Sequence, residues 1–191
     1  MEKVVLDSLI KRITRGILIK SSELDNITSE EKTNNSFVRI KNIENGLFTG
    51  DMIYLTKIDD KYKKYCINDN NLVISKIGKP YKVCVAKVEK GQNLLASGNL
   101  FILKLDLDKV DPYYLASYLS SDKGTKLLDD ITAGSVIPSL VMSQFRALEI
   151  DVPSMDEQIR IGKIYLDTVN KIKELQNMLQ DEIESLKHIV Q

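Results

Sequence analysis

The sequence predicts an α+β protein in which one mainly β domain with short helices precedes a long C-terminal α-helix. Three observations lead to this fold class. Residues 1–106 contain short apolar or alternating runs broken by Gly, Asn and Pro, the pattern of short strands and turns. Residues 111–148 change to helical spacing. From residue 154 onward there is no proline and a single glycine, Gly162, so one helix can continue to residue 191.

Composition favours a globular protein with a buried core. The chain has 191 residues, of which 43% are hydrophobic and 28% charged. No run approaches the roughly 18 apolar residues of a membrane span, and charges interrupt the start of the chain, so we expect no signal peptide and a cytoplasmic location. Cys66 and Cys84 lack CxxC spacing, so we expect neither a metal site nor a disulfide framework. No motif indicates a cofactor. We expect two parts, a domain over residues 1–153 and the helix over residues 154–191.

The first half of the chain predicts strands joined by irregular connections. The first twenty residues predict a short strand or helical turn and then a strand that breaks at Gly16, and the polar stretch 21–36 predicts a loop. Alternation over residues 37–43 predicts a half-buried strand. The Asn-Gly pair at 45–46 marks a tight turn before another strand over residues 47–56.

A hairpin and a further strand complete the predicted β region. The β-rich runs 71–78 and 81–88 flank a Gly-Lys-Pro bend, which indicates a hairpin. Residues 99–106 predict another strand. Its alternate apolar side chains lie on one face: Phe101, Leu103 and Leu105.

Three short helices are expected next. Asp111 predicts an N-cap and Pro112 the first helical position of a helix that ends near residue 121. A second helix is expected over residues 121–131, and a loop at 132–140 separates it from the rest. The last two elements expected before the long helix are a short helix or turn at 141–148 and a strand at 149–153.

The long helix begins with an S-x-x-E capping box at Ser154 and Glu157. A helix of about 36 residues would be about 54 Å long, too long to pack wholly on a domain of this size. Its heptad positions form an apolar seam, interrupted by Thr168 and Glu182. The predicted helix–helix interface consists of Ile161, Tyr165, Ile172, Leu175, Leu179, Leu186 and Ile189. The alternative is one amphipathic helix folded over its own domain.

No arrangement of side chains in the sequence predicts an active site. His188, the only histidine, lies near the end of the long helix and far from any expected pocket. The chain has neither a Walker loop nor a GxGxxG motif. "DPYY" at 111–114 resembles the D-P-P-Y signature of amino-methyltransferases, but it lacks the second proline and an early Gly-rich cofactor loop. A capped helix explains it, and we expect a non-catalytic chain.

Positive charge is concentrated in the first half of the chain. Residues 1–90 carry 17 Lys and Arg against 12 Asp and Glu, a net charge of +5, and the remainder carries −5. Lys and Arg neutralise phosphates, and Arg, Asn, Ser and Lys can read base edges. The lysines around the hairpin also fit the solvated face of two strands, so charge alone leaves both readings open.

The order of motifs resembles the specificity subunits of type I restriction–modification systems. The resemblance covers essentially the whole chain and rests on "VVLDSLIKRITRG", "LVISKIGKPYKVCVA", "VDPYYLASYLSS", "ITAGSVIPSLVMSQFRALEIDVPSMDEQIRIG" and the long helix. The junction "VPSMDEQIRI" is the most specific piece. The family's usual subunit has two target recognition domains and two helical segments. This chain has one of each, so it resembles a half-subunit.

The resemblance implies a DNA-reading subunit without catalysis of its own. A target recognition domain, here residues 1–153, reads one half of a bipartite double-stranded DNA sequence. The helices set the spacer and bind the modification subunits, which carry the adenine methyltransferase chemistry, and indirectly the restriction subunit. Two copies would pair as a homodimer through antiparallel helices. The residues expected to face DNA are Arg39, Lys41, Lys76, Lys79, Tyr81, Lys82, Gly134, Ser135 and Ser139.

Two other functions stay open from the sequence. A β-rich domain tethered to a protein partner by a coiled coil would show no salt-dependent DNA binding. An enzyme would need a cofactor pocket that the sequence does not indicate, and cofactor binding by the isolated chain would reveal it.

Overall fold

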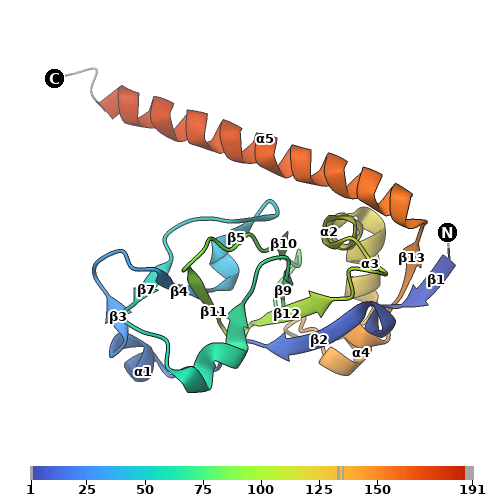
Figure 1. The fold of residues 1–191 in the computed structure, drawn as a ribbon, viewed down its shortest axis with the longest axis horizontal. Coiled ribbons are helices and arrows are strands. Elements are labelled where there is room, and N and C mark those ends of the chain that lie inside the picture. The colour runs from blue at the N-terminus through green and yellow to red at the C-terminus, as the bar shows by residue number, and fades with distance from the viewer. Residues whose placement is uncertain (1, 133, 135, 188–191) are drawn as a thin grey trace.

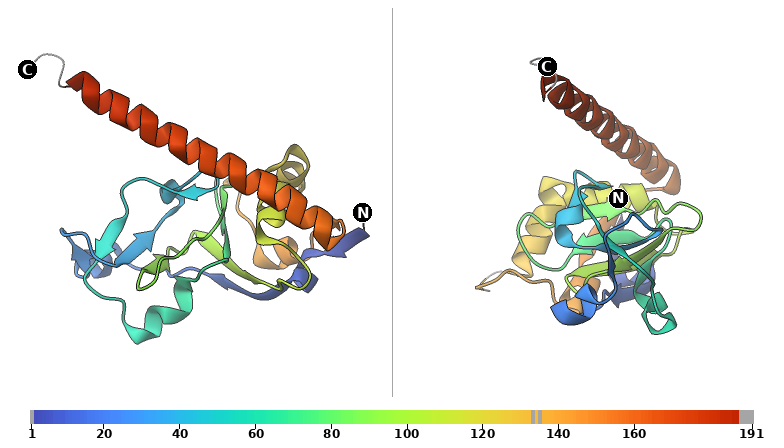
Figure 2. Two further views of the ribbon diagram at one scale, coloured as in Figure 1. Left: turned by 45° about the horizontal axis from the view of Figure 1, so that its top comes forward. Right: turned by 90° about the vertical axis from the view of Figure 1, so that its left-hand side faces the viewer.

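The computed structural model describes residues 2–132, 134 and 136–187. A β-rich domain with short helices lies under one long helix, α5 (Met155–Lys187), which crosses its upper side and rises away from it (Figures 1 and 2). The α+β fold class predicted from the sequence is therefore confirmed. No helix in the described part of the chain has the length and apolar character needed to cross a membrane.

A four-stranded antiparallel sheet forms the centre of the domain, in the order β10-β9-β12-β2. Its strands are β2 (Ile10–Arg15), β9 (Leu72–Ser75), β10 (Val83–Val85) and β12 (Leu100–Leu105). Antiparallel pairing of β9 with β10 confirms the predicted hairpin. The predicted break at Gly16 is also confirmed. A Cβ there would lie 2.1 Å from the carbonyl oxygen of Ser97, so only glycine allows this approach.

A second sheet of five strands has the order β3-β7-β4-β11-β8, with β11 parallel to β4 and the other pairs antiparallel. Its strands are β3 (Thr28–Ser29), β4 (Asn35–Val38), β7 (Ile53–Leu55), β8 (Cys66–Ile67) and β11 (Asn93–Ala96). A 3₁₀ helix, η3 (Asp60–Tyr65), connects β7 to β8. The stretch 21–36, predicted as a loop, instead contains α1 (Ser21–Asp25), β3 and the start of β4. Its few aliphatic side chains, Leu24 and Ile27, pack against buried residues of this sheet.

The predicted strands at 37–43 and 47–56 are both interrupted, and buried Asn42 explains why. Its carboxamide oxygen accepts from the Arg39 amide at 3.0 Å, and its Nδ2 donates to the carbonyls of Thr49 and Asp51. These bonds satisfy backbone groups that would otherwise need ladder partners. The outcome is a 3₁₀ helix (Ile40–Asn42) and a small hairpin of β5 (Ile43–Glu44) and β6 (Leu47–Phe48). The predicted Asn-Gly turn lies between those two strands.

The three short helices form where the sequence predicts them. They are α2 (Pro112–Ser120), α3 (Asp122–Asp130) and α4 (Met142–Arg146). Asp111 caps α2 by accepting from the Tyr114 amide at 2.8 Å, and Ser121 caps α3 by accepting from the Gly124 amide at 3.2 Å. The strand before α5, β13 (Glu149–Val152), pairs antiparallel with β1 (Glu2–Val5), and a 3₁₀ helix (Leu6–Leu9) follows β1. The N-terminal strand therefore lies beside the start of α5 (Figure 1).

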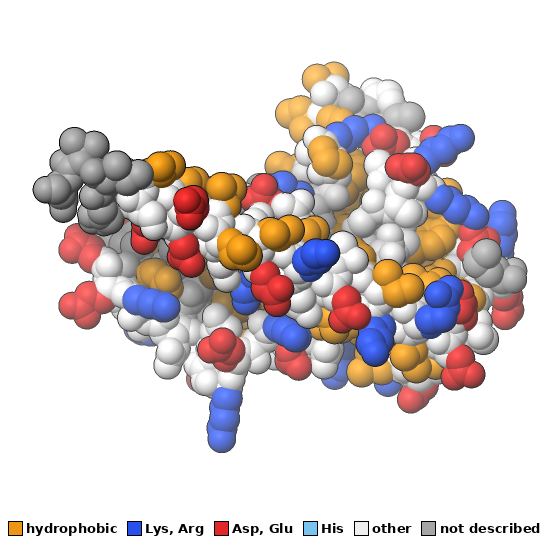
Figure 3. Space-filling view, turned by 90° about the horizontal axis from the view of Figure 1, so that it is seen from above, with side chains coloured by type: hydrophobic (Ala, Val, Ile, Leu, Met, Phe, Trp, Pro, Cys, Tyr) orange, Lys and Arg blue, Asp and Glu red, His pale blue; other side chains and the backbone are white. Residues whose placement is uncertain are grey.

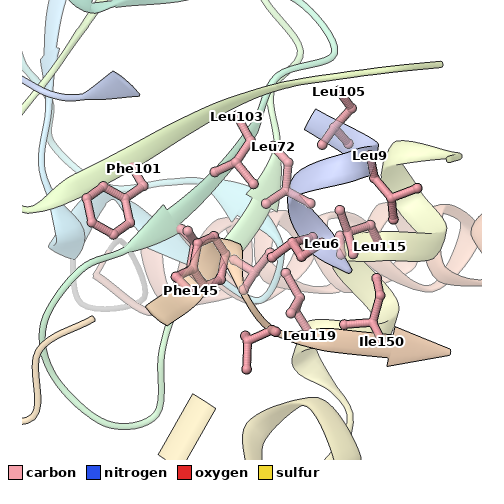
Figure 4. Packing of buried hydrophobic residues seen from close by; sticks show 14 of the residues in the cluster. Leu6, Leu9, Leu72, Phe101, Leu103, Leu105, Leu115, Leu119, Phe145 and Ile150 are labelled. Atoms are coloured by element: carbon pink, nitrogen blue, oxygen red, sulfur yellow. The ribbon is translucent and has the colours of Figure 1, made fainter. Parts of the chain in front are cut away.

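The central sheet is buried on both faces. Phe101 and Leu103 of β12 point toward the helices, where Phe101 meets Phe145 of α4 at 6.2 Å between ring centroids (Figure 4). Leu100 and Ile102 face the five-stranded sheet. The predicted apolar face of this strand is confirmed. Leu100 and Ile102 on its other face are also buried, because the domain has three layers rather than two, whereas Lys104 on that face is exposed.

The long helix is confirmed, whereas the predicted capping box is not: among the described residues neither Ser154 Oγ accepts from the Glu157 amide nor the Glu157 carboxylate from the Ser154 amide. Both carboxylate oxygens of Glu157 accept hydrogen bonds from Arg160, one turn further along, at 2.6 and 2.7 Å. Arginine offers a bidentate, charge-assisted pair, which competes with a single bond to a backbone amide.

Candidate nucleic-acid interface

The bend of the β9–β10 hairpin is joined to the loop that follows α3. The Leu140 amide donates to the Lys76 carbonyl at 2.8 Å, and the Gly78 amide donates to the Pro138 carbonyl at 3.3 Å. An isolated bridge links Ile77 to Ser139. Two segments that are about 60 residues apart in sequence therefore form one surface, and both contain residues predicted to face DNA.

Lys76 and Ser139 meet at this junction. The Lys76 ammonium donates to the Ser139 hydroxyl at 2.7 Å. Burial lowers the pKa of the Lys76 amino group, and the nearby positive charge of Arg15 lowers that pKa further. Arg15 is held in place by a hydrogen bond from its Nε to the Gly98 carbonyl at 2.7 Å. Two half-buried cations lie near each other here, an arrangement that an anion would stabilise.

The other predicted residues of the hairpin differ in how much they expose. Lys79 forms an ion pair with Asp129 at 2.7 Å, so part of its charge is already neutralised. Tyr81 is only 8% exposed and its hydroxyl donates to Thr132 at 3.1 Å, which makes it a core residue rather than a surface one. Lys82 is half-buried. The side chains on the inner face of a tight hairpin fill the core. A period-2 pattern shows which residues share a face, but it does not show which face is the inner one.

The predicted residues of the loop are only partly described. Gly134 is exposed, with φ of 80°, a conformation that glycine adopts without strain. Ser135 lies outside the described residues. Val136 and Ile137 follow, and their side chains are 100% and 69% exposed. Both residues lie in the predicted loop 132–140, and hydrophobicity alone would not predict such exposure.

Arg39 and Lys41 lie apart from the hairpin, beside a hollow of about 400 Å³. Its floor is apolar and includes Phe37, and its rim carries both cations together with Gly98 and Asn99. The Lys76 amide donates to the Asn99 carbonyl at 2.7 Å, so the rim adjoins the hairpin bend. The structure thus places the surface with Arg39 and Lys41 next to the hairpin bend with Lys76.

The junction before α5 is organised by Gln158, which the sequence analysis noted only as part of a motif. Its side chain is 2% exposed. The carboxamide oxygen accepts from the Asp111 amide at 3.0 Å, and Nε2 donates to the carbonyls of Pro153 and Lys109 at 3.1 and 3.3 Å. One side chain therefore ties the start of α5 to the start of α2.

Glycine allows α5 to lie directly on α2. A Cβ at Gly162 would lie 2.2 Å from the Asp111 carboxylate. One turn further, the Tyr165 hydroxyl and Val169 approach the turn at Gly46, where a Cβ would lie 2.7 and 2.9 Å from them. The first half of α5 is thus fixed to the domain at two places.

The predicted helix–helix seam divides into two parts. Ile161 and Tyr165 pack against the domain's own core instead of a free surface, and Ile172 is half-buried. Beyond them the seam is open to solvent. Its exposed members are Leu175, Leu179 and Leu186, and Ile189 lies outside the described residues. Met178 and Ile183, which were not predicted in the seam, are exposed beside them. Figure 3 shows hydrophobic side chains following the helix toward its C-terminal end.

Comparison with known proteins matches this arrangement to one family. The family model described as "Type I restriction modification DNA specificity domain" matches residues 1–185. A curated relative from Methanocaldococcus jannaschii, named "Putative type I restriction enzyme MjaX specificity subunit", is 30% identical over 92 residues, which is 48% of this chain and 22% of the relative.

Solved structures share the fold. The type I restriction–modification S subunit from M. genitalium is 17% identical with a TM-score of 0.66 over 96% of this chain. The HsdS subunit from Thermoanaerobacter tengcongensis is 16% identical with a TM-score of 0.61 over 97%. The chain spans 42% and 46% of the lengths of these two structures.

Proposed function

The chain belongs to the type I restriction–modification DNA specificity family, and we propose that it reads one half of a bipartite target in double-stranded DNA. In this proposal residues 1–153 contact DNA and residues 154–191 form a spacer helix. Methyl transfer to adenine is carried out by modification subunits that dock on this chain, and a restriction subunit joins through them.

The observation that carries the proposal is the meeting of Lys76, Ser139 and Arg15. They come from the hairpin bend, the loop after α3 and the end of β2, and they place a hydroxyl bonded to one half-buried cation near a second cation. Phosphate contacts position a protein on DNA, and nearby polar groups then read base edges. A hydroxyl beside two cations provides both kinds of group in one place.

The remaining predicted residues extend this surface. Arg39 and Lys41 on the adjoining rim, with Lys79 and Lys82 on the hairpin, would contact the DNA backbone. Gly134 and Ser135 would let the loop backbone approach the duplex. Tyr81 supports the hairpin from inside through Thr132 rather than touching DNA.

Binding to DNA tests the surface directly. The double change Arg15→Ala and Lys76→Ala should weaken binding of a duplex and lower its salt dependence, because each lost phosphate contact reduces the slope of log K against log salt by about 0.9. The matched control Lys163→Ala with Lys171→Ala removes the same charge from exposed positions on α5. The salt dependence would be measured by fluorescence anisotropy. If the two variants have equal slopes of log K against log salt, the hairpin surface does not contact DNA.

The proposed assembly is a homodimer through antiparallel α5 helices. The exposed stripe beyond residue 172 supports it, because a stripe of five large apolar side chains on one helix is costly to leave in water. Antiparallel pairing relates the two domains by a two-fold axis, so the target would consist of two inverted half-sites around a fixed gap.

The oligomeric state has its own test. Leu175→Lys with Leu179→Lys should convert dimers to monomers in sedimentation velocity, because both side chains are more than half exposed in the monomer and would be buried in the pair. Asn177→Lys with Gln180→Lys adds the same charge on another face of the helix and should leave the dimer intact. A dimer that survives the leucine changes contradicts the proposed pairing.

The complete function is tested by methylation mapping. The chain would be expressed with a modification subunit in cells that lack other adenine methylases. A symmetric bipartite motif is expected. An asymmetric motif would mean that a second, different reader takes part. An assembled complex that methylates no site would favour the alternative of a protein-interaction module.

A further inference from the structure

A second cationic surface lies on the side of the domain opposite α5. Its centre is a hollow of about 130 Å³ between β2, β12 and the segment around β8. We define the cationic hollow by the charged and amide side chains that line it: Arg12, Lys64, Asn68, Asn71 and Lys104. In Figure 1 and in the left panel of Figure 2, α5 lies above the domain and β2 lies below it.

Like charges face each other across two strands in this hollow. The antiparallel register of β12 and β2 places Lys104 directly opposite Arg12. Such a pair destabilises a sheet, because like charges stand about 5 Å apart at their Cβ atoms. Arg12 donates its Nε to the Thr14 hydroxyl at 3.1 Å, which holds the guanidinium over the sheet rather than away from it.

No acid compensates this repulsion within the described residues. None of Arg12, Lys64 and Lys104 forms an ion pair there, although neighbouring cations do: Lys11 pairs with Asp106 at 3.0 Å and Lys63 with Asp60 at 2.7 Å. The acids in this region are thus already used by the lysines next to the hollow. Arg12, Lys64 and Lys104 thus line one hollow without an ion-pair partner among the described residues, and the Lys64 ammonium lies 5.0 Å from the centroid of the Tyr65 ring.

The hollow continues into a second, larger one. Lys64 also lines a neighbouring hollow of about 550 Å³, whose rim carries Arg15, Lys61 and Tyr65. Arg15 is the residue that lies beside Lys76 at the hairpin bend. Arg15, Lys61 and Lys64 therefore connect the proposed DNA-reading junction to the pair of Arg12 and Lys104, and of these Lys61 is paired with Glu23 at 4.0 Å.

The size and lining of the cationic hollow indicate its ligand. About 130 Å³ is smaller than the roughly 300 Å³ of the smallest pockets that hold a whole small molecule, but a phosphate group fits. Two asparagine amides beside the cations can donate to phosphate oxygens. A row of such contacts extending beyond one hollow suits a polymer of phosphates better than a single anion.

We propose that the cationic hollow binds the phosphodiester backbone of the same duplex whose bases are read near Lys76. This inference rests on the proposed function and adds the path of the DNA: it runs along β2, on the side of the domain away from α5. The backbone phosphates supply the negative charge that relieves the repulsion between Arg12 and Lys104.

The test uses the full chain with three lining cations neutralised, Arg12→Gln, Lys64→Gln and Lys104→Gln. Affinity for a 30-base-pair duplex would be measured by fluorescence anisotropy from 50 to 200 mM salt. We expect the salt slope to fall by about 2 to 3 and binding to weaken on the order of 10²-fold at 0.1 M salt, since each phosphate contact contributes about 0.9 to the slope. The matched control neutralises Lys163, Lys171 and Lys187 on α5 and should keep the wild-type slope.

Two further measurements separate binding from folding. The charge-conserving change Arg12→Lys with Lys104→Arg should keep the slope. The triple variant should unfold at a temperature no lower than the wild type, because it loses a like-charge pair. If the triple variant unfolds at a lower temperature than the wild type, the charge-conserving variant provides the test. A fall in its salt slope would overturn the inference.

The outcomes distinguish this inference from the function it rests on. If wild-type protein binds the duplex and the triple variant keeps the slope of the α5 control, the hollow does not contact DNA, while the proposed function stands. If the wild type shows no salt-dependent binding to duplex DNA, both fail. If inorganic phosphate at millimolar concentration displaces the duplex completely, the hollow binds single anions and the proposed path is wrong.

Discussion

Replacing Gly162 with alanine tests how α5 is joined to the domain. In an ordinary helix interior this change is favourable by about 1 kcal/mol, because alanine loses less backbone entropy than glycine. Here the added Cβ would lie 2.2 Å from Asp111 Oδ1 and 3.1 Å from the Tyr114 amide nitrogen. Asp111 Oδ1 is the atom that caps α2 by accepting from that amide at 2.8 Å. The methyl group must therefore displace either the cap or the helix.

The magnitude follows from these contacts. Displacing the Asp111 cap costs about 1 kcal/mol, and crowding a well-packed contact costs about 1–3 kcal/mol. The helix propensity of alanine offsets about 1 kcal/mol of this. We expect a net loss of about 2 kcal/mol in the free energy of unfolding. For a chain of this size that corresponds to a fall of roughly 4–8 °C in Tm.

Urea denaturation of wild type, Gly162→Ala, Asp111→Ser and the double variant would measure it. Serine is shorter than aspartate and still caps a helix, so Gly162→Ala should cost at least 1 kcal/mol less in the Asp111→Ser background, a coupling that the double-mutant cycle isolates. A stabilised Gly162→Ala protein, as in a helix with no close neighbour, would refute the reasoning.

Three further predictions concern the same framework. Gln158→Glu should destabilise the protein by about 2–3 kcal/mol in urea titrations at pH 7, because it removes the donors to the Lys109 and Pro153 carbonyls and buries a charge. This loss of stability should be smaller in acid, where the new carboxylate is protonated. The hydrogen bond from Lys123 holds the pKa of the Asp151 carboxyl below its ordinary value, so its stabilisation exists above about pH 4 and is lost as the pH falls through the folded-state pKa. Asp151→Asn should therefore flatten the acid limb of a plot of stability against pH, and an unchanged limb would contradict this role. Phe101→Ala should cost about 3–5 kcal/mol, whereas truncating the exposed Leu18 should stay within about 0.5 kcal/mol.

The double attachment of α5 bears on the proposed function. Gln158 and Gly162 hold its first turns to α2, and the contact of Tyr165 and Val169 with Gly46 holds it two turns later. Two attachment points define the direction of a straight helix relative to the domain. In the proposed dimer that direction sets the distance between the two DNA-reading surfaces. Changes at Gly46 or Gly162 should therefore alter the length of the spacer between the two half-sites of the methylated sequence.

Local patterns predicted the elements whose cause lies within a few residues. The Asp111 cap of α2, the hairpin of β9 and β10 and the long helix all follow from neighbouring residues, and each forms as predicted. The interruption of the strands at Asn42 was missed because its carboxamide bonds backbone groups up to 9 positions away. Such bonds leave no periodic signal.

Charge indicated the side of the protein that carries its proposed site, but it did not identify the residues. Lys76 and Ser139 were both predicted, and the structure brings them within 2.7 Å. Tyr81 was predicted at the surface and is buried, and the facing pair of Arg12 and Lys104 was not predicted. Strand register decides both, because a shift of one residue exchanges the two faces of a strand.

The sequence by itself determined the fold class, the family and the presence of a long helix with an apolar seam, since these depend on composition, motif order and period. Only the tertiary structure decided how that seam is used. The close approach at Gly162 lays the first half of α5 on its own domain, where Ile161 and Tyr165 pack, and leaves Leu175, Leu179 and Leu186 exposed. A heptad pattern states which side chains share a face, whereas the shape of the rest of the molecule determines what that face meets.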